Sequence, residues 1–429
     1  MTAQIHPAVS RSFLDPPAWT GHDKSEYPAP PPHRDEAPIP PPPGFPSRIQ
    51  CPMAWSKNSD VSPESQILEL GPNEVVEVEQ AMTHFLSLEL DGSEVARENF
   101  PLPTLGARLQ KHAIDIHRGN GLCIIRGIRP GTYSAEVNTI MFLGLASYIG
   151  AQRGVQTAKG AMLISVLEGS PRETPWDSHK SQPGAEHPDN PEHVFRTAVL
   201  IYVYKQPFHN DMGCEILAMH IRNCAAKGGG TYVASAAAIY NAVMKANPLV
   251  VHTLAQRNWP VQIARQGTSQ FVLAPLLAYE SGNLMISVDP GRIGPHPAVI
   301  GNQIPELLPA QKEALALLQK TAVAQQIKLP TVQGDMVFIN NWSILHARDS
   351  YVDNGMAARH LVRLWLRNPE LGQTIPDSMK APWEASFGAR AKKIVNRQYP
   401  VAPMPEYIEP KFTNGSAAFV MEESDKSDL

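Results

Sequence analysis

From about residue 196 onward, the chain alternates short apolar segments with turn residues, and this pattern restricts the fold more than any other feature. Short apolar segments between turn signals are typical of β-strands. Many such strands in succession favour a sandwich or barrel over a parallel α/β sheet. The predicted strands are 196–204, 214–221, 230–234, 259–264, 270–274, 284–288, 335–340, 343–347 and 358–366.

Helices are predicted around these strands. Two of them, near 235–246 and 306–326, interrupt the strand series. Closer to the N-terminus, 121–128 is predicted to be a buried strand bounded by glycines, and the helix after it has Ser134 as its N-cap. We therefore predict a mainly β fold with flanking helices (α+β), whose core is a double-stranded β-helix, also called a jelly roll.

Composition divides the chain into one large domain and two tails. The first 50 residues hold 13 prolines and no hydrophobic periodicity, so 1–65 is predicted to be a Pro-rich arm or a disordered tail. The chain ends in an acidic run, and 413–429 is predicted to be a mobile tail. Between them, 66–412 is predicted to form a single jelly-roll domain with N-terminal helical elements. The polar segment near 151–195 is a candidate lid.

Charge and composition exclude several classes of partner. The formal net charge is −4 and the pI is about 6.4, and no long basic block is present, so we expect no nucleic-acid partner. No apolar window reaches the roughly 18 residues that cross a bilayer, so we expect no membrane partner and a cytoplasmic location. The four cysteines are scattered, which is typical of reduced thiols. The sequence does not determine the oligomeric state and allows a homo-oligomer.

The candidate catalytic residues are His209 and Asp211, two positions apart, and the distant His346. Two imidazoles and one carboxylate hold one face of the metal in non-haem iron(II) oxygenases and leave the other positions open. In a jelly roll, strands that are distant in sequence face each other across a cavity, so the three side chains can meet at one ion. We predict that they are iron(II) ligands and that the protein is an enzyme.

The His-x-Asp pattern alone does not identify the site, because it also begins at His33 and at His187. His33 lies in the proline-rich stretch and His187 in a polar run. His209, in contrast, closely follows the apolar segment 198–204. A metal ligand needs a rigid scaffold, so His209 is the best placed of the three.

The predicted strand 358–366 carries two arginines on a face that is otherwise apolar. Strand periodicity places four side chains together: Arg359, Leu361, Arg363 and Trp365. Buried guanidinium groups are costly unless an anion meets them, and no acid lies within the strand. Either distant Asp or Glu residues pair with them or the carboxylates of ligands do. On the second interpretation, Arg359 binds the distal carboxylate of 2-oxoglutarate and Arg363 binds a second anion, the substrate's own carboxylate.

Five motifs in order resemble the TauD/TfdA family of iron(II)- and 2-oxoglutarate-dependent dioxygenases. They are Phe-His-x-Asp ending at Asp211, Lys-Gly-Gly-Gly-Thr ending at Thr231, Gly-Asp-Met-Val-Phe-Ile-Asn-Asn at 334–341, Leu-His-Ala-Arg ending at Arg348, and the paired arginines. The pattern is most similar to the clavaminate-synthase-like and γ-butyrobetaine-hydroxylase-like branches. The likeness runs from about Leu122 to Asn368.

The resemblance implies roles for individual residues. His209, Asp211 and His346 would be the iron ligands, and Arg359 would grip the C5 carboxylate of 2-oxoglutarate with help from the Thr231 hydroxyl. Arg363 matches a position that contacts an anionic substrate in some members. The chain departs from the family at Gly230, where an acid is common, and at Asn340-Asn341, where Asp-Asn is common.

The implied cofactors are iron(II), 2-oxoglutarate as cosubstrate, and dioxygen. The implied reaction oxidises an unactivated C–H bond of a small, carboxylate-bearing substrate, either amino-acid-derived or a secondary metabolite. Hydroxylation, desaturation and ring formation are all open, with release of succinate and CO2. The presence of Asp211 disfavours halogenation. Two other classes stay open: a cupin-like isomerase or lyase that uses the metal without 2-oxoglutarate, and a jelly-roll protein that binds a small anion. The cosubstrate-dependent enzyme is the class that needs Arg359.

Overall fold

The structure is a computed structural model, and its described residues lie in one compact unit, Pro40–Leu429, apart from Ile39. The described residues are 39–59, 61–157, 160–167, 206–265, 268–295, 304–352, 359–394, 397–401 and 420–421. Among them, no helix is both long and apolar enough to cross a bilayer.

The larger sheet brings together strands from the whole length of this unit. Its order is β1-β2-β14-β6-β17-β3, and β4 also pairs with β17. The β1–β2 pair is parallel and the other pairs are antiparallel. The bounds are β1 (Ile67–Glu69), β2 (Leu122–Arg126), β3 (Gln152–Arg153), β4 (Leu163–Leu167), β6 (Ile216–Asn223), β14 (Met336–Asn340) and β17 (His360–Arg367).

A second, antiparallel sheet has the order β13-β8-β15-β5, and the other described strands form separate, smaller sheets. Its strands are β5 (Gln206–His209), β8 (Thr231–Ser235), β13 (Ile327–Lys328) and β15 (Ile344–Arg348). The smaller ladders pair β7 (Lys227–Gly228) with β16 (Tyr351–Val352), β11 (Leu277–Glu280) with β12 (Asn283–Ile286), and β9 (Trp259–Arg265) with both β10 (Thr268–Ala274) and β18 (Val420–Met421).

Side chains from both sheets share one apolar interior. Alternate residues of β6, β14 and β17 enter it, together with Val233 of β8 and Ile344 of β15. The intervening residues of β6 and β17 belong to a different apolar cluster, on the outer face of the larger sheet. This alternation is the period of two that a strand imposes on its side chains. The interior between the sheets is therefore bounded by the faces that carry Leu361 and Trp365 on one side and Val233 on the other.

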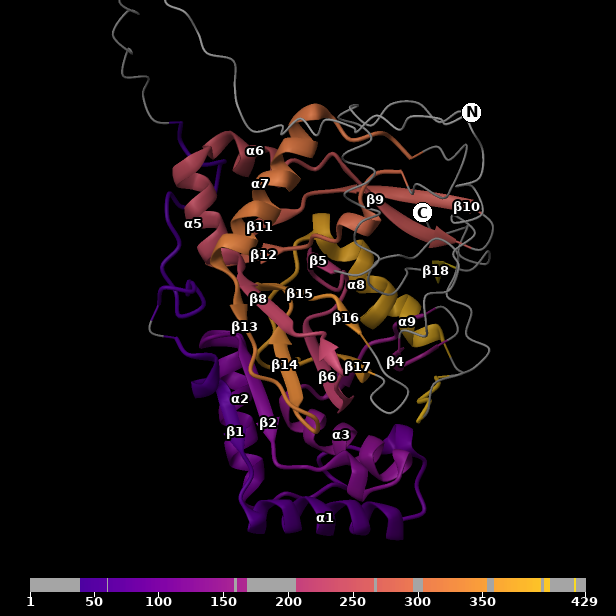
Figure 1. Cartoon of the computed structure of the whole chain (residues 1–429). Helices are drawn as coiled ribbons and strands as arrows, with labels where there is room; N and C mark the ends of the chain where they lie inside the picture. The colour runs from indigo at the N-terminus through magenta and orange to yellow at the C-terminus, as the bar shows by residue number, and fades with distance from the viewer. Residues whose placement is uncertain are drawn as a thin grey trace, which may run out of the picture. The chain divides into compact units, whose positions relative to one another are not determined.

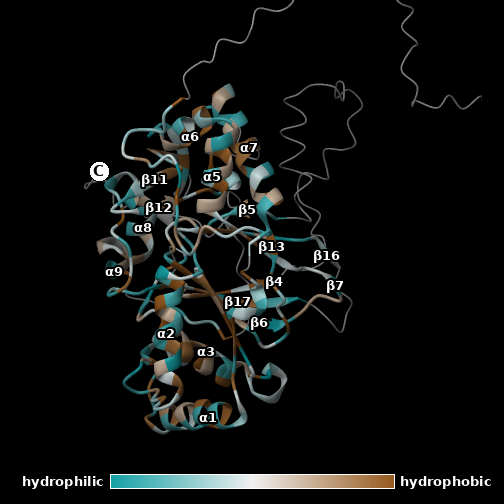
Figure 2. Ribbon diagram, turned by 90° about the vertical axis from the view of Figure 1, so that its left-hand side faces the viewer, coloured by the Kyte–Doolittle hydropathy of each residue, from teal (hydrophilic) through white to brown (hydrophobic). Residues whose placement is uncertain are grey.

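Helices cover the outer face of each sheet (Figure 1). Helices α1 (Pro72–Ser87), α2 (Leu105–Arg118) and α3 (Ala135–Ile149) pack on the larger sheet, and α5 (Ala236–Ala246), α6 (Pro248–Ala255) and α7 (Pro309–Gln325) pack on the second. Helix α1 carries both hydrophilic and hydrophobic residues along its length (Figure 2) and buries Val78, Ala81 and Phe85. Within the described ranges, the remaining helices are α8 (Lys380–Phe387), α9 (Ala389–Lys393), and the 3-10 turns Pro63–Gln66, Gly92–Glu94, Pro130–Thr132, Pro290–Arg292 and Asp377–Met379.

The described part of the proline-rich segment lies against α5. The ring of Phe45 stacks on Tyr240, with 6.1 Å between ring centroids. The side chain of Asn241 accepts a hydrogen bond from Ile49 N and donates one to Ile49 O, both at 2.8 Å. Trp55 Nε1 donates to the carbonyl of Asn120 at 2.8 Å. Residues before 39, and most of the segment expected to be an acidic tail, lie outside the described residues.

Local sequence signals located most of these elements. Each predicted strand from 214–221 to 358–366 overlaps an observed one, and both predicted helices are present as α5 and α7. Ser134 caps α3 as predicted, because its hydroxyl accepts from Val137 N. The structure confirms mixed sheets with flanking helices. The predicted strand 196–204 and most of the candidate lid lie outside the described residues.

Candidate metal centre

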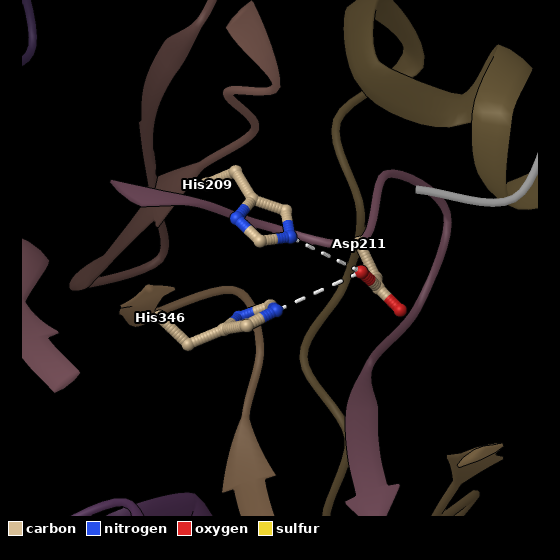
Figure 3. Close-up of side chains that lie close together, drawn as sticks. All are labelled: His209, Asp211 and His346. Atoms are coloured by element: carbon tan, nitrogen blue, oxygen red, sulfur yellow. Dashed lines mark ion pairs between the residues drawn. The ribbon is translucent and has the colours of Figure 1, made fainter. Parts of the chain in front are cut away.

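His209, Asp211 and His346 come together at the second sheet. His209 ends β5 and His346 lies in the middle of β15, and the two residues are direct partners in the antiparallel ladder. Their ring centroids are 4.1 Å apart. Asp211 Oδ1 lies 3.8 Å from His209 Nε2 and 3.7 Å from His346 Nε2 (Figure 3). All three residues are buried, and one potential ligand atom from each lies within 4.8 Å of the others.

Two asparagine side chains fix the backbone at Asp211. Asn341 Oδ1 accepts from Asp211 N at 3.0 Å, and Asn341 Nδ2 donates to the carbonyls of Asp211 and Cys214, both at 2.8 Å. Asn210 Nδ2 donates to the carbonyls of Asn341 and Ile344. Because these amides are buried, rearranging the turn would leave several polar groups unpaired. The turn is therefore a rigid support for the carboxylate.

The two oxygens of the Asp211 carboxylate have different surroundings. Oδ2 accepts from Trp365 Nε1 at 2.7 Å and pairs with Arg363 Nη1 at 3.1 Å. Oδ1 is buried without a hydrogen-bond partner and faces the two imidazoles. Buried polar atoms are almost always paired, so an unpaired carboxylate oxygen beside two imidazole nitrogens fits a metal ion.

The protonation of the site suits a cation. Burial alone would raise the pKa of Asp211, but the charge of Arg363, the two histidines and the Trp365 hydrogen bond together lower it. Burial, with the neighbouring His209, lowers the pKa of His346 to about 3. His209 Nδ1 lies 2.9 Å from the carbonyl of Pro207. Because a carbonyl only accepts, a neutral ring carries its proton on Nδ1, and its Nε2 lone pair accepts from Gln206 Nε2 at 3.0 Å. A metal ion bound at His209 Nε2 would take the place of this amide.

Comparisons with known proteins agree with this geometry. The profile described as "Taurine catabolism dioxygenase TauD, TfdA family" matches residues 87–365, more than half of the chain. A relative from Stachybotrys chartarum (strain CBS 109288 / IBT 7711), the taurine hydroxylase-like protein SAT17, is 32% identical over 342 residues, which are 78% of this chain and 84% of the relative. The chain belongs to the TauD, TfdA family. This membership confirms the expected class, a dioxygenase that depends on iron and 2-oxoglutarate.

A solved structure shows a similar fold. The crystal structure of asparagine oxygenase (AsnO) matches with a TM-score of 0.50 at 13% identity, covering 74% of this chain and 100% of the other. The non-heme iron oxygenase OrfP, in complex with Fe and alpha-ketoglutaric acid, matches with a TM-score of 0.48 at 15% identity, covering 70% and 93%. At 13% identity, the likeness to asparagine oxygenase concerns the fold.

The two residues assigned by family resemblance to 2-oxoglutarate lie in one neighbourhood. Thr231 begins β8 and is the ladder partner of Arg348, whose guanidinium lies 4.8 Å from the ring centroid of Tyr351. The guanidinium of Arg359 lies 5.4 Å from the same centroid. A Cβ atom on Gly229 would lie 3.2 Å from Arg359 Cδ, so the glycine allows the arginine to pack closely against the loop. Thr231 and Arg359 are both buried.

Arg363 has a protein partner that the sequence did not reveal. Its Nη1 pairs with Asp211 Oδ2, and its Nε donates to Gln156 Oε1 at 2.9 Å. The inference that Arg363 needs a ligand carboxylate because it lacks a protein partner therefore does not hold. A distant acid of the chain forms an ion pair with it. The acid is Asp211 itself, which places the guanidinium beside the metal centre. A contact between Arg363 and the substrate stays a prediction.

Sequence reasoning missed the residues that support the centre. Asn341 and Trp365 stood in the recognised motifs without a role, and Gln156 had none. Their spacing alone gives no sign that Asn341 and Trp365 reach Asp211 or that Gln156 reaches Arg363, since each contact joins segments that are far apart in the sequence. The competing dyads at His33 and His187 lie outside the described residues.

Proposed function

We propose that this protein oxidises an unactivated C–H bond of a small substrate with iron(II), 2-oxoglutarate and dioxygen, releasing succinate and CO2. The observation that carries the proposal is the buried Asp211 Oδ1, which has no donor and faces His209 and His346. The family supports the reaction class. Hydroxylation is the favoured outcome among hydroxylation, desaturation and ring formation, because the 32% identical relative is named a taurine hydroxylase-like protein.

Three side chains of this protein would hold the iron: His209 and His346 through Nε2, and Asp211 through Oδ1. Dioxygen would be the oxidant: bound iron and 2-oxoglutarate would activate it, with two of its four electrons coming from the conversion of 2-oxoglutarate to succinate and CO2 and two from the substrate C–H bond. The chain positions the reactants and limits the access of water, since the three ligands are at most 8% exposed. A crystal of the metal-loaded protein should show the three ligand atoms about 2.0–2.2 Å from the ion.

We assign the C5 carboxylate of 2-oxoglutarate to Arg359, with the hydroxyl of Thr231 beside it. A guanidinium binds a carboxylate through two parallel hydrogen bonds, and Arg359 is 6% exposed, so water competes little for it. The Gly228-Gly229 segment, with φ of +79° and +71°, lets the loop approach the arginine without a side chain.

We propose a small, anionic substrate, and we assign its anionic group to Arg363. The relative's printed name includes taurine, which carries a sulfonate, and this supports an anion. Arg363 is 15% exposed in its side chain and lies beside Asp211, so it is close to where a substrate must approach the metal. We further propose that the two facing sheets form the double-stranded β-helix expected from the sequence, within a single domain over 66–412.

The test of the proposal is release of succinate from 2-oxoglutarate by purified protein with ferrous iron. Even slow turnover without substrate identifies the class. Asp211→Ala should abolish succinate release, because it removes the charged ligand. The matched controls are His33→Ala and His187→Ala, which alter the other His-x-Asp dyads and should retain activity. Loss of activity in either control, with retention in Asp211→Ala, would refute the site.

A further inference from the structure

Trp365 makes its hydrogen bond to the proposed metal ligand. The indole is 1% exposed, and its Nε1 donates to Asp211 Oδ2 at 2.7 Å. Asp211 is fully buried, and its other oxygen has no donor. An indole N–H can only donate, so this bond holds one carboxylate oxygen, Oδ2, toward the tryptophan.

The hydrogen bond from Trp365 reaches Asp211 from the larger sheet, whereas the two histidines lie in the second sheet. His209 and His346 belong to β5 and β15 of the second sheet. Trp365 belongs to β17 of the larger sheet, where it pairs with Leu217 of β6. β17 is bonded to β6 on one side and to β3 and β4 on the other, so its position is well constrained. The carboxylate is thus held from across the interior, on the side away from the imidazoles.

We propose that Trp365 is a positioning residue that keeps Asp211 as a one-oxygen metal ligand, with Oδ1 aimed at the space between the two histidines. This inference rests on the proposed function, because it concerns the same metal. The torsion that turns a carboxylate is broad, so the side chain itself does not choose between one-oxygen and two-oxygen binding. A two-oxygen ligand would draw Oδ2 away from Trp365 and leave a buried N–H without an acceptor.

The distinction matters for the chemistry. If His209, Asp211 and His346 each gave one atom to the iron, the remaining positions would stay free for 2-oxoglutarate and dioxygen. A second oxygen from Asp211 would occupy one of these positions. Groups that orient metal ligands in this way are part of a metal site, and removing them commonly weakens metal binding by about 10- to 100-fold.

Arg363 also contacts Oδ2, but it does not replace the indole. Its guanidinium has several donors and already bonds Gln156 Oε1, whereas the indole has a single donor. The guanidinium is also the group that we assign to the substrate. Trp365 therefore supplies the bond to Oδ2 that does not depend on whether a substrate is present.

The experiment compares two replacements of Trp365 by metal titration and by spectroscopy. Trp365→Phe removes the N–H and part of the ring. Site-specific replacement by β-(3-benzothienyl)alanine exchanges the N–H for sulfur and nearly keeps the shape, so it also covers a failure of the first variant to fold. Both should bind Fe(II), under anaerobic conditions, and Co(II) about 10- to 100-fold more weakly than the unaltered protein. The visible spectrum of the Co(II)-loaded protein, which reports ligand number and geometry, should change.

The matched control is Trp383→Phe, because Trp383 Nε1 is buried but has no hydrogen-bond partner. It should leave both the metal affinity and the Co(II) spectrum unchanged. Unaltered affinity and spectrum in the benzothienyl variant would overturn the role of Trp365 while Asp211→Ala still abolished metal binding. If the unaltered protein bound neither metal, the proposed function itself would fall. The two failures are therefore distinguishable.

Discussion

The inner and outer faces of the β6–β17 pair both bury polar atoms without hydrogen-bond partners, but only the inner face has the composition of a metal site. On the inner side, Asp211 Oδ1 is unpaired and faces two imidazoles. On the outer side, His220 is fully buried under α3 and neither ring nitrogen has a partner. An unpaired buried atom is thus not sufficient evidence of a site. The kind and charge of the groups that converge on it decide.

The titratable side chains on the outer face, His220, Arg222 and His360, are all basic, and in the described residues no carboxylate joins them as Asp211 joins the two imidazoles of the inner face. His220 lies against Phe142, with 5.4 Å between ring centroids, and Arg222 Nη2 donates to Thr139 Oγ1 at 3.0 Å. Burial, reinforced by Arg222 and His360, lowers the pKa of His220 well below its usual value. Burial lowers the pKa of Arg222 to about 10, and in the described part of the chain no carboxylate shifts it. A cation has no reason to bind there, whereas Asp211 attracts one at the inner face.

The largest difference between the faces should appear in turnover. His346→Ala removes an inner imidazole and should abolish succinate release, because two ligands hold iron too weakly in the presence of competing water. His220→Leu removes an outer imidazole and should keep turnover within about threefold, since a swap of similar volume away from the site is usually tolerated. Initial rates at saturating iron measure both. Equal loss in the two variants would remove the functional distinction between the faces.

The sequence predicted the candidate ligands because each lies in a short motif, and it missed the residues that support them because those contacts join distant segments of the chain. His209 and Asp211 form one short motif. Alternation within 358–366 correctly predicted that Trp365 and Val362 lie on opposite faces of the strand. The partner of Arg363 could not be predicted, since Asp211 lies on a distant turn and is reached only after β17 pairs with β6. Likewise, β14 lies between β2 and β6 in the larger sheet, and this order depends on tertiary packing that no local sequence pattern encodes.

A second comparison sets an inner arginine against an outer one. Arg359→Ala should weaken 2-oxoglutarate binding by about 2–5 kcal/mol, because a bidentate charged contact in a buried pocket is lost. That corresponds to roughly 30- to 5,000-fold in Kd. Arg222→Met, on the outer face, should leave this affinity unchanged. Anaerobic titration of the iron-loaded protein measures both, and unaltered affinity in Arg359→Ala would show that the cosubstrate anchor is misassigned.

A third prediction concerns the substrate. Arg363→Leu should raise KM for an anionic substrate by roughly 10- to 100-fold, as expected when a charged hydrogen bond worth about 1.5–3 kcal/mol is lost. The affinity for 2-oxoglutarate should stay nearly constant, because Arg359 makes that contact. A substrate screen with both proteins tests this. A preferred substrate that is neutral, or an unchanged KM, would limit the role of Arg363 to its ion pair with Asp211.

The smallest effect should be a change of stability at the outer face. In His220→Leu, an apolar side chain replaces a ring whose polar atoms have no partners, so the free energy of unfolding at pH 7 should rise by about 1–2 kcal/mol. The pH dependence should change as well. Because the pKa of His220 is lowered in the folded protein, the unfolded chain binds the proton first as the pH falls below about 6.5.

The unaltered protein therefore loses stability from this group as the pH decreases, by up to about 1.4 kcal/mol per pH unit. The variant lacks this contribution, and the gap between the two proteins should widen by about 1.6 kcal/mol between pH 6.5 and pH 5. Urea denaturation across this range measures the gap. If the free energies of unfolding of the two proteins fell in parallel with pH, His220 would be able to take up a proton in the folded protein. The outer face would then have to be reconsidered as a binding site for an anion.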